Sequence, residues 1–397
     1  MKSLPITVER QTMNVQIDGV GFANKGAELM LRAIVDRITR RYPDATLVWG
    51  KNSKKCGFQD ISGLGIYQWF TLKKFMIPLH IIPRALKMDV GKYGLIYKGQ
   101  VDVLLDAGGF QFGDHRVRKK DYANKIDRYY GRFKGKKAKI FFLPQAFGPF
   151  NEGISLSVIR AVATHADLIF ARDRVSYSSL TKALGESKKI HLFPDFTNLV
   201  PGKISKELEA LVSGGICIIP NSKMVTHTDS TVGQNYVHFL KRVFVEVQSK
   251  GKRLFLLNHG GEGDYKICRE IRDQVDSHIE VFSGLNALEV KGIIGASHLV
   301  ISSRFHGASS ALSQGVPCLV TSWSHKYPML LKDYDIQGGV LDVRDGSTAI
   351  AEVMKYAEEP FNLKLRDHLA ENSKKLKAKS EKMWDMVFEV IDRSKAG

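Results

Sequence analysis

Three basic side chains follow the ends of two predicted strands in the second half of the chain. Arg304 and His306 come two serines after the apolar run 299–301, where a short helix of small residues begins, and Lys326 follows the next predicted strand, 316–321. Ligands of open α/β sheets bind at the carboxyl ends of the strands, and a helix N-terminus there adds free N–H groups and a partial positive charge. The segment therefore predicts a pocket for a phosphate or carboxylate group. The alternative for His306 is an ordinary polar residue at a helix start.

Polar residues and glycines occupy the same kind of position in the first half of the chain. A loop after the predicted strand 13–20 leads into a helix with an acidic residue in its first turn, and the predicted strand 101–107 ends in two glycines. Paired glycines at a strand end allow a ligand to approach the backbone, whereas turn formation and helix capping are the alternative roles. The residues expected at this edge are Asn24, Lys25, Glu28, Gly108 and Gly109.

The positions of these side chains depend on strands and helices that alternate along the chain. The hydrophobic pattern predicts this alternation. The alternation runs to about residue 195 and restarts near residue 215, after a segment that contains Pro201 and Gly202. Such alternation is typical of parallel sheets covered by helices. We therefore predict an α/β protein of two Rossmann-like domains whose parallel sheets face each other across a cleft. The expected units are residues 1–195, residues 196–345 and a helical tail, 346–397, that packs back on the domains.

Composition agrees with two globular domains in a reducing compartment. The chain has 397 residues, of which 44% are hydrophobic and 25% charged, and such a length exceeds one ordinary core. Its four cysteines lie far apart without a Cys/His pattern that would bind metal. We therefore expect no bound metal. We also expect neither a signal peptide nor a membrane-spanning segment, and hence a cytoplasmic protein.

A net charge of +18, from 59 Lys+Arg and 41 Asp+Glu, favours anionic partners. Many of the basic residues lie between 116 and 139, interleaved with aromatic residues. This stretch indicates either a solvated helix face or a surface for nucleic acid. The common sequence signatures of nucleic-acid binding are absent, so we expect no nucleic-acid partner.

The segment 66–88 mixes aromatic, aliphatic and lysine residues, with Pro78 and Pro83 as breaks. It predicts either an apolar flap that lies on a membrane surface or a buried helical insertion. The flap would make the protein peripheral at the inner face of the cell membrane.

Several short motifs, in their order along the chain, resemble those of the polysaccharide pyruvyl transferase family. The resemblance covers about residues 14 to 335 and departs from the commoner pattern at Ala27–Glu28 and Ala146–Phe147. The motifs are NKGAE at 24–28, VDVLLDAGG at 101–109 with Asp114 beyond it, PQAFGPF at 144–150, ARDRVS at 171–176, PDFTNLV at 194–200, and SSRFHGASSALSQGVPCLVTSW at 302–323, followed by Lys326.

The resemblance implies a GT-B-like fold and a reaction that moves the enolpyruvyl group of phosphoenolpyruvate (PEP) onto sugar hydroxyls as a pyruvate ketal. The donor would bind the second domain, and a sugar or lipid-linked oligosaccharide acceptor would bind the first. By this similarity Arg304, His306 and Lys326 hold PEP with Arg172 reaching in from the first domain. PEP is then the donor substrate, and no cofactor is expected. The similarity specifies neither the acceptor sugar nor the oligomeric state.

The chemistry requires a proton donor and a base. His306 is the candidate general acid, since imidazole titrates near neutral pH; a phosphate ligand is its alternative role. Candidate bases are the carboxylates Glu28, Asp106, Asp114 and Asp195, and we place Glu28 and Asp114 with His306 in the catalytic set.

Three other functions fit parts of the sequence. A GT-B glycosyltransferase that uses a nucleotide sugar would have the same fold, with Glu289 as a loose candidate for ribose binding. A nucleic-acid-binding protein is suggested by charge alone. A catalytically silent binding module on the same fold is the third, because a fold never proves an activity.

Overall fold

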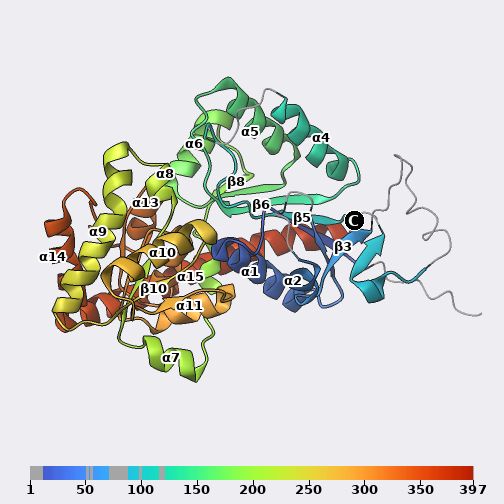
Figure 1. Cartoon of the computed structure of the whole chain (residues 1–397). Helices are drawn as coiled ribbons and strands as arrows, with labels where there is room; N and C mark the ends of the chain where they lie inside the picture. The colour runs from blue at the N-terminus through green and yellow to red at the C-terminus, as the bar shows by residue number, and fades with distance from the viewer. Residues whose placement is uncertain are drawn as a thin grey trace, which may run out of the picture.

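The computed structural model describes residues 12–50, 53, 57–70, 88–97, 101–115 and 121–396. Within these residues the chain forms two parallel β-sheets, each covered by helices on both faces (Figure 1). This architecture confirms the predicted α/β class with two parallel sheets.

The described part of the first domain contains an eight-stranded sheet in the order β4-β3-β2-β1-β5-β6-β7-β8, with every neighbouring pair parallel. Side chains of β5 show how the sheet separates two cores: Val103 and Leu105 face one core and Leu104 faces the other. The strands are β1 (Asn14–Asp18), β2 (Thr46–Trp49), β3 (Ile66–Phe70), β4 (Leu95–Tyr97), β5 (Val103–Asp106), β6 (Lys139–Gln145), β7 (Leu168–Ala171) and β8 (Ile190–Leu192).

Helices on either face of this sheet bury an apolar stripe. Helix α4 buries Ile126, Tyr130 and Phe133, spaced by four and three residues, so the basic stretch around it is a helix with an exposed charged face. Residues 116–120 of that stretch lie outside the described residues. The helical elements of this domain are α1 (Lys25–Arg41), α2 (Phe58–Ser62), η1 (Gly91–Tyr93), α4 (Tyr122–Lys134), α5 (Gly153–His165), α6 (Arg174–Leu184) and η2 (Phe196–Leu199).

The second sheet, five-stranded in the described residues, has the order β11-β10-β9-β12-β13 and is also parallel. Its strands are β9 (Ile216–Ile219), β10 (Leu254–Leu257), β11 (Val281–Phe282), β12 (Leu299–Ser302) and β13 (Cys318–Val320). The helices around it are α7 (Lys206–Val212), α8 (Lys223–Thr226), α9 (Ser230–Ser249), α10 (Glu262–Val275), α11 (Ala287–Ala296), α12 (Phe305–Leu312), α13 (Lys326–Asp333) and α14 (Gly346–Ala357).

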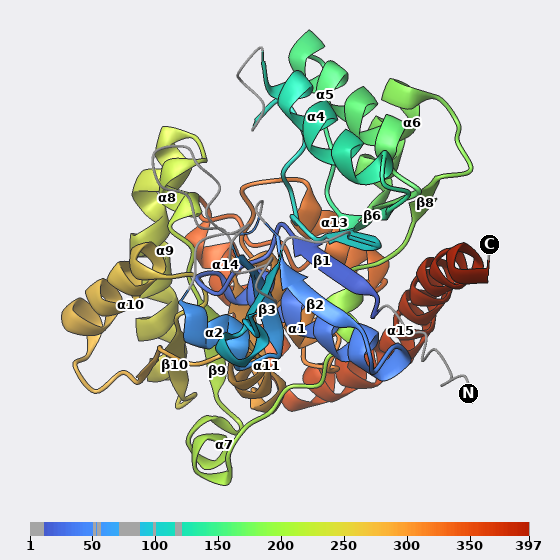
Figure 2. The same cartoon turned by 90° about the vertical axis from the view of Figure 1, so that its right-hand side faces the viewer.

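The last helix, α15 (Glu359–Ala396), packs on both domains. Leu369 and Leu376 belong to a core of the second sheet, whereas Met383 and Trp384 belong to a core of the first. Figure 2 shows the helix running from beneath the second domain to the first sheet, where the chain ends. The helix therefore ties the two domains together through apolar contacts.

The prediction for segment 66–88 was wrong in its first part. Residues 66–70 are neither a flap nor a helix but strand β3, which continues the sheet beside β2 and pairs with β4. Ile66 is buried, and the Trp69 indole donates a hydrogen bond to Gln16 Oε1 at 3.1 Å. Aromatic residues favour strands, which accounts for the pairing. Residues 71–87, and with them most of the predicted flap, lie outside the described residues.

None of the helices in the described residues combines the length and the apolar character that crossing a bilayer requires.

Replacing Trp384 with alanine should separate α15 from the first domain. Its ring is almost completely buried between Phe196 and Phe388, and removal of such a side chain costs about 3–5 kcal/mol. Urea unfolding would measure the loss. Asp385→Ala, at the exposed neighbouring position, is the matched control and should change stability by about 0.5 kcal/mol or less. Equal effects of both substitutions would contradict this role of α15.

Candidate active site

Loops at the carboxyl ends of both sheets line one pocket of about 720 Å³ between the domains. The loops after β1, β5 and β7 form one side, and those after β9, β10, β12 and β13 form the other. Among the residues that the structure describes, five lysines or arginines and two histidines line this pocket, without any aspartate or glutamate. The pocket therefore suits an anionic ligand.

The pocket contains all four residues expected to bind PEP: Arg172, Arg304, His306 and Lys326. Arg172 follows β7 of the first domain, whereas the other three lie at the N-termini of α12 and α13 in the second. The structure thus brings together residues that are up to 154 positions apart in the sequence.

Asp195 connects Arg172 and His306 behind the pocket. Its Oδ2 accepts a hydrogen bond from Arg172 Nη1 and lies 3.3 Å from His306 Nε2, and its Oδ1 accepts from the backbone N–H of Thr197 at 3.0 Å. Burial alone would raise the pKa of Asp195, but the neighbouring His306 and Arg172 outweigh it and hold the pKa below its usual value. Asp195 therefore stays a carboxylate that orients two pocket side chains and is not placed as a base for a substrate.

The imidazole of His306 lies directly against the backbone of α1. A Cβ atom added to Gly26 would come within 2.1 Å of His306 Nδ1, so the ring fits only because residue 26 is glycine. Burial lowers the pKa of His306 from its ordinary value, Asp195 opposes the shift, and Arg172 and Lys326 add to it. Burial of the ring therefore favours the neutral imidazole.

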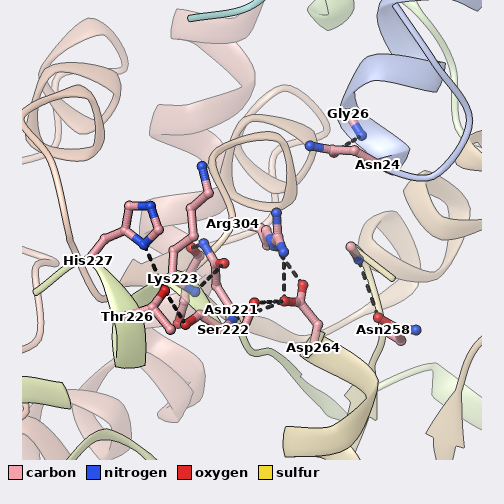
Figure 3. Close-up of polar contacts among 12 residues, drawn as sticks. Asn24, Gly26, Asn221, Ser222, Lys223, Thr226, His227, Asn258, Asp264 and Arg304 are labelled. Atoms are coloured by element: carbon pink, nitrogen blue, oxygen red, sulfur yellow. Dashed lines mark hydrogen bonds and ion pairs between the residues drawn. The ribbon is translucent and has the colours of Figure 1, made fainter. Parts of the chain in front are cut away.

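Arg304 is held by a buried carboxylate. Its Nε and Nη2 donate to Asp264 Oδ2 and Oδ1 at 2.7 and 2.6 Å, and the backbone N–H and hydroxyl of Ser222 donate to the same carboxylate. Figure 3 shows both arginine contacts on one side of the guanidinium, with another nitrogen pointing away from Asp264. Such a bidentate pair fixes the plane of the guanidinium for a ligand.

Lys326 lies among aromatic rings. Its Nζ is 4.2 Å from the centre of the Trp323 ring and 5.5 Å from that of Phe110, distances typical of cation–π contacts. The loops of both domains therefore surround the ammonium group, because Phe110 follows β5 and Trp323 follows β13.

Besides Arg172, three of the first-domain residues predicted to bind substrate line the pocket, and one does not. Gly108, Gly109 and Asn24 are on its wall, and Asn24 Oδ1 caps α1 by accepting from the Gly26 N–H at 3.0 Å. Figure 3 shows the Asn24 amide nitrogen directed away from the helix, across from Arg304. Lys25 instead pairs with Glu28 at 2.9 Å beside the pocket.

Glu28 and Asp114, both predicted to be catalytic, have structural partners outside the pocket. Buried Glu28 pairs with Lys25 and Arg32 and accepts a hydrogen bond from the backbone N–H of Ala287, so it clamps α1 to the start of α11. Asp114 accepts from the N–H groups of Asn151 and Glu152 and from Ser155. An acidic residue at a helix N-terminus is commonly a cap, and the structure places both carboxylates in such roles.

Asp106 lies beneath the glycine loop rather than in the pocket. Its Oδ1 accepts from the Gly108 N–H at 3.1 Å and from Gln111, and its Oδ2 accepts from the Tyr130 hydroxyl. Burial raises the pKa of Asp106, and burial together with the Asp106 charge raises the pKa of neighbouring Asp18 to about 7. These buried carboxyl groups fix the course of the loop that forms the pocket wall.

Sequence reasoning missed several pocket residues that follow the same rule as Arg304. Asn221 and Lys223 come after β9, and His259 comes after β10, so each lies at the carboxyl end of a strand. The other pocket residues not assigned a role from the sequence include Tyr122, Lys125, Trp323 and Tyr327. Glu289, the loose candidate for ribose binding, accepts from the Asn286 N–H in the capping box of α11. Three-residue clusters of His, Cys, Asp or Glu that could hold a metal are absent from the described residues.

Solved structures with the same fold define the structural class as GT-B-like. UDP-GlcNAc 2-epimerase from Neisseria meningitidis, bound to UDP-GlcNAc, has a TM-score of 0.59 at 13% identity over 95% of this chain and 100% of its own. HepE from Anabaena, in complex with UDP and glucose, has a TM-score of 0.57 at 10% identity over 96% and 100%. A UDP-forming trehalose-phosphate synthase from Burkholderia xenovorans has a TM-score of 0.53 at 9% identity over 98% and 100%.

Within this class the chain belongs to the polysaccharide pyruvyl transferase family, whose family model matches residues 24–325. This match confirms the family inferred from the motifs. A search of curated proteins finds no match.

Alanine at position 26 should expel the His306 ring from its place against α1. The ring would move toward the open pocket, and its lowered pKa should rise toward about 6.5 as desolvation is relieved. Ring ¹⁵N NMR of His306 across a pH titration would measure the shift. Gly153→Ala, at the start of α5 with open space around its Cβ position, is the control. An unchanged His306 resonance in Gly26→Ala would contradict the contact.

Proposed function

We propose that the protein transfers the enolpyruvyl group of PEP to hydroxyls of a sugar in a cell-surface polysaccharide or its lipid-linked precursor and forms a pyruvate ketal. Family membership supports the donor and the general class of acceptor. The observation that carries the proposal is the convergence of Arg172, Arg304, His306 and Lys326 in a pocket whose described lining has no carboxylate.

PEP carries a phosphate and a carboxylate, about three negative charges when the phosphate is fully ionised. Arg304 and Lys326, together with the start of α12, would bind these groups from the second domain. Arg172 would reach them from the first domain, since its guanidinium stacks 3.8 Å from the centre of the Phe305 ring. The donor would therefore lie where residues of both domains meet.

His306 would protonate the methylene carbon of PEP and so create a carbon centre that a sugar hydroxyl can attack. The proton has to arrive with the substrate, because burial lowers the pKa of His306. Bound PEP places negative charge beside the ring, and a nearby anion raises the pKa of an imidazole. Donor binding and protonation of the acid are thus coupled.

Thermal unfolding with PEP should separate binding residues from surface charge. Lys326→Met should weaken PEP binding by about 10- to 100-fold, since hydrogen bonds between charged groups contribute about 1.5–3 kcal/mol. Lys332→Met, on the exposed side of the same helix, should leave the PEP-induced shift of the midpoint unchanged. Stabilisation by a UDP-sugar without stabilisation by PEP would instead favour a nucleotide-sugar glycosyltransferase.

Calorimetric titration at pH 8 should detect proton uptake when PEP binds. Both free His306, with its lowered pKa, and free PEP phosphate, with a pKa near 6, are deprotonated at this pH. Binding heats in buffers of different ionisation enthalpy give the number of protons taken up. The uptake should vanish in His306→Asn and persist in His238→Asn, a substitution at an exposed site. Uptake that survives in His306→Asn would exclude His306 as the proton carrier.

A further inference from the structure

The proposed reaction requires a base for the acceptor hydroxyl, and the carboxylates considered from the sequence do not fill this role. Glu28, Asp106, Asp114 and Asp195 all have structural partners, and none lines the described pocket. The polar side chains that do line it are cations, amides, phenols, an indole and two imidazoles. Of these, only a neutral imidazole is an ordinary proton acceptor near neutral pH.

His259 is the second imidazole of the pocket. It follows β10 and is 3% exposed, and its Nδ1 is buried without a hydrogen-bond partner among the described residues. Buried polar atoms are nearly always hydrogen-bonded in proteins. Because His259 lines the pocket and its Nδ1 has no hydrogen-bond partner among the described residues, the ring retains hydrogen-bonding capacity that a ligand can use.

Residues of both domains contact the loop that carries His259. Its carbonyl accepts a hydrogen bond from the Lys25 N–H of α1 at 3.2 Å. Next to it, a Cβ atom on Gly260 would come within 2.2 Å of Arg304 Nη2, so the loop packs directly on that guanidinium. Figure 3 shows Asn258, whose Oδ1 accepts from the Gly260 N–H, holding the same turn.

We propose that His259 is the general base that accepts the proton of the acceptor hydroxyl. This assignment rests on the proposed function, because it presumes that PEP binds beside His306. Two histidines would then divide the proton transfers of the first addition, with His306 on the donor carbon and His259 on the attacking acceptor oxygen.

The electrostatic surroundings favour the form that a base requires. Burial lowers the pKa of His259 well below its ordinary value, and Arg304, His306 and Lys25 lower it further. The ring is therefore neutral and keeps a lone pair. Bound PEP would offset these positive charges and raise the basicity of the ring, so that the base becomes effective when the donor is present.

The proton transfers balance over the complete reaction. His306 in its protonated form gives a proton to the CH₂ carbon, the acceptor oxygen bonds to C2, and the hydroxyl proton passes to His259. The bond from C2 to the phosphate oxygen then breaks, and phosphate leaves as HPO₄²⁻ with the proton from His259. A second hydroxyl of the same sugar closes the ketal on C2, and its proton returns to His306. Nothing is oxidised or reduced, and both histidines recover their starting forms.

Chemical rescue tests the two roles separately. Phosphate release from PEP would be followed for wild type, His259→Gly and His306→Gly, with methyl glycosides of galactose, mannose and glucose as acceptors and with water alone. General-base catalysis contributes about 10²- to 10⁴-fold, so His259→Gly should lose activity by that factor and retain the PEP-induced thermal shift. Added imidazole should restore His259→Gly in proportion to neutral imidazole, increasingly at higher pH, whereas rescue of His306→Gly should increase at lower pH.

The results that would contradict the assignment of His259 as the base can be told apart from failure of the proposed function. Wild type that neither binds PEP nor releases phosphate from it would refute the proposed function, and the base with it. If wild type is active, a His259→Gly variant within a few-fold of its rate would exclude His259. Loss of the PEP-induced shift, or inactivity that imidazole does not relieve, would make His259 a structural residue. His259→Asn, which keeps a hydrogen-bonding side chain, should remain inactive if the base is required and regain activity if packing is its role.

Discussion

The contact between Gly26 and His306 is the constraint on which the site depends. It brings the N-terminus of α1 in the first domain against the N-terminus of α12 in the second with no room for a side chain between them. Two hydrogen bonds also join α1 to the second domain: Glu28 accepts from the Ala287 N–H, and the Lys25 N–H donates to the His259 carbonyl. These contacts join the two domains beside the pocket, whose lining comes from both of them.

The fold and the cationic end of the site could be predicted from the sequence, because both follow from local rules. Strand and helix alternation gave the two parallel sheets, and the rule that ligands lie at strand carboxyl ends located Arg304, His306 and Lys326. The same rule applied to the strands that become β9 and β10 would have found Lys223 and His259. They were missed because neither stands in a pattern of several charged residues, whereas the segment around Arg304 does.

The errors arose where a local pattern has two physical explanations. A carboxylate in the first helical turn is either a cap or a functional group, and only the positions of Arg32 and the α11 N-terminus show that Glu28 is a clamp. Asp114 likewise serves a helix that begins 39 residues later. Strand β3 was misassigned because Trp69 and Phe70 resemble a membrane-binding segment until a neighbouring strand provides hydrogen bonds.

The charge of the pocket governs both protein stability and chemistry. Cations gathered without a carboxylate in the described lining repel one another. Burial lowers the pKa of His306 and His259, and neighbouring cations lower it further. Buried carboxylates behind the pocket stabilise these cations: Asp195 accepts a hydrogen bond from Arg172, and Asp264 accepts one from Arg304. Because these carboxylates are buried on the far side, they orient the cations while leaving the field toward the pocket positive. A donor with three negative charges would relieve this repulsion and would also raise the pKa of His306. Binding of the donor would therefore favour the protonated imidazole that the reaction requires.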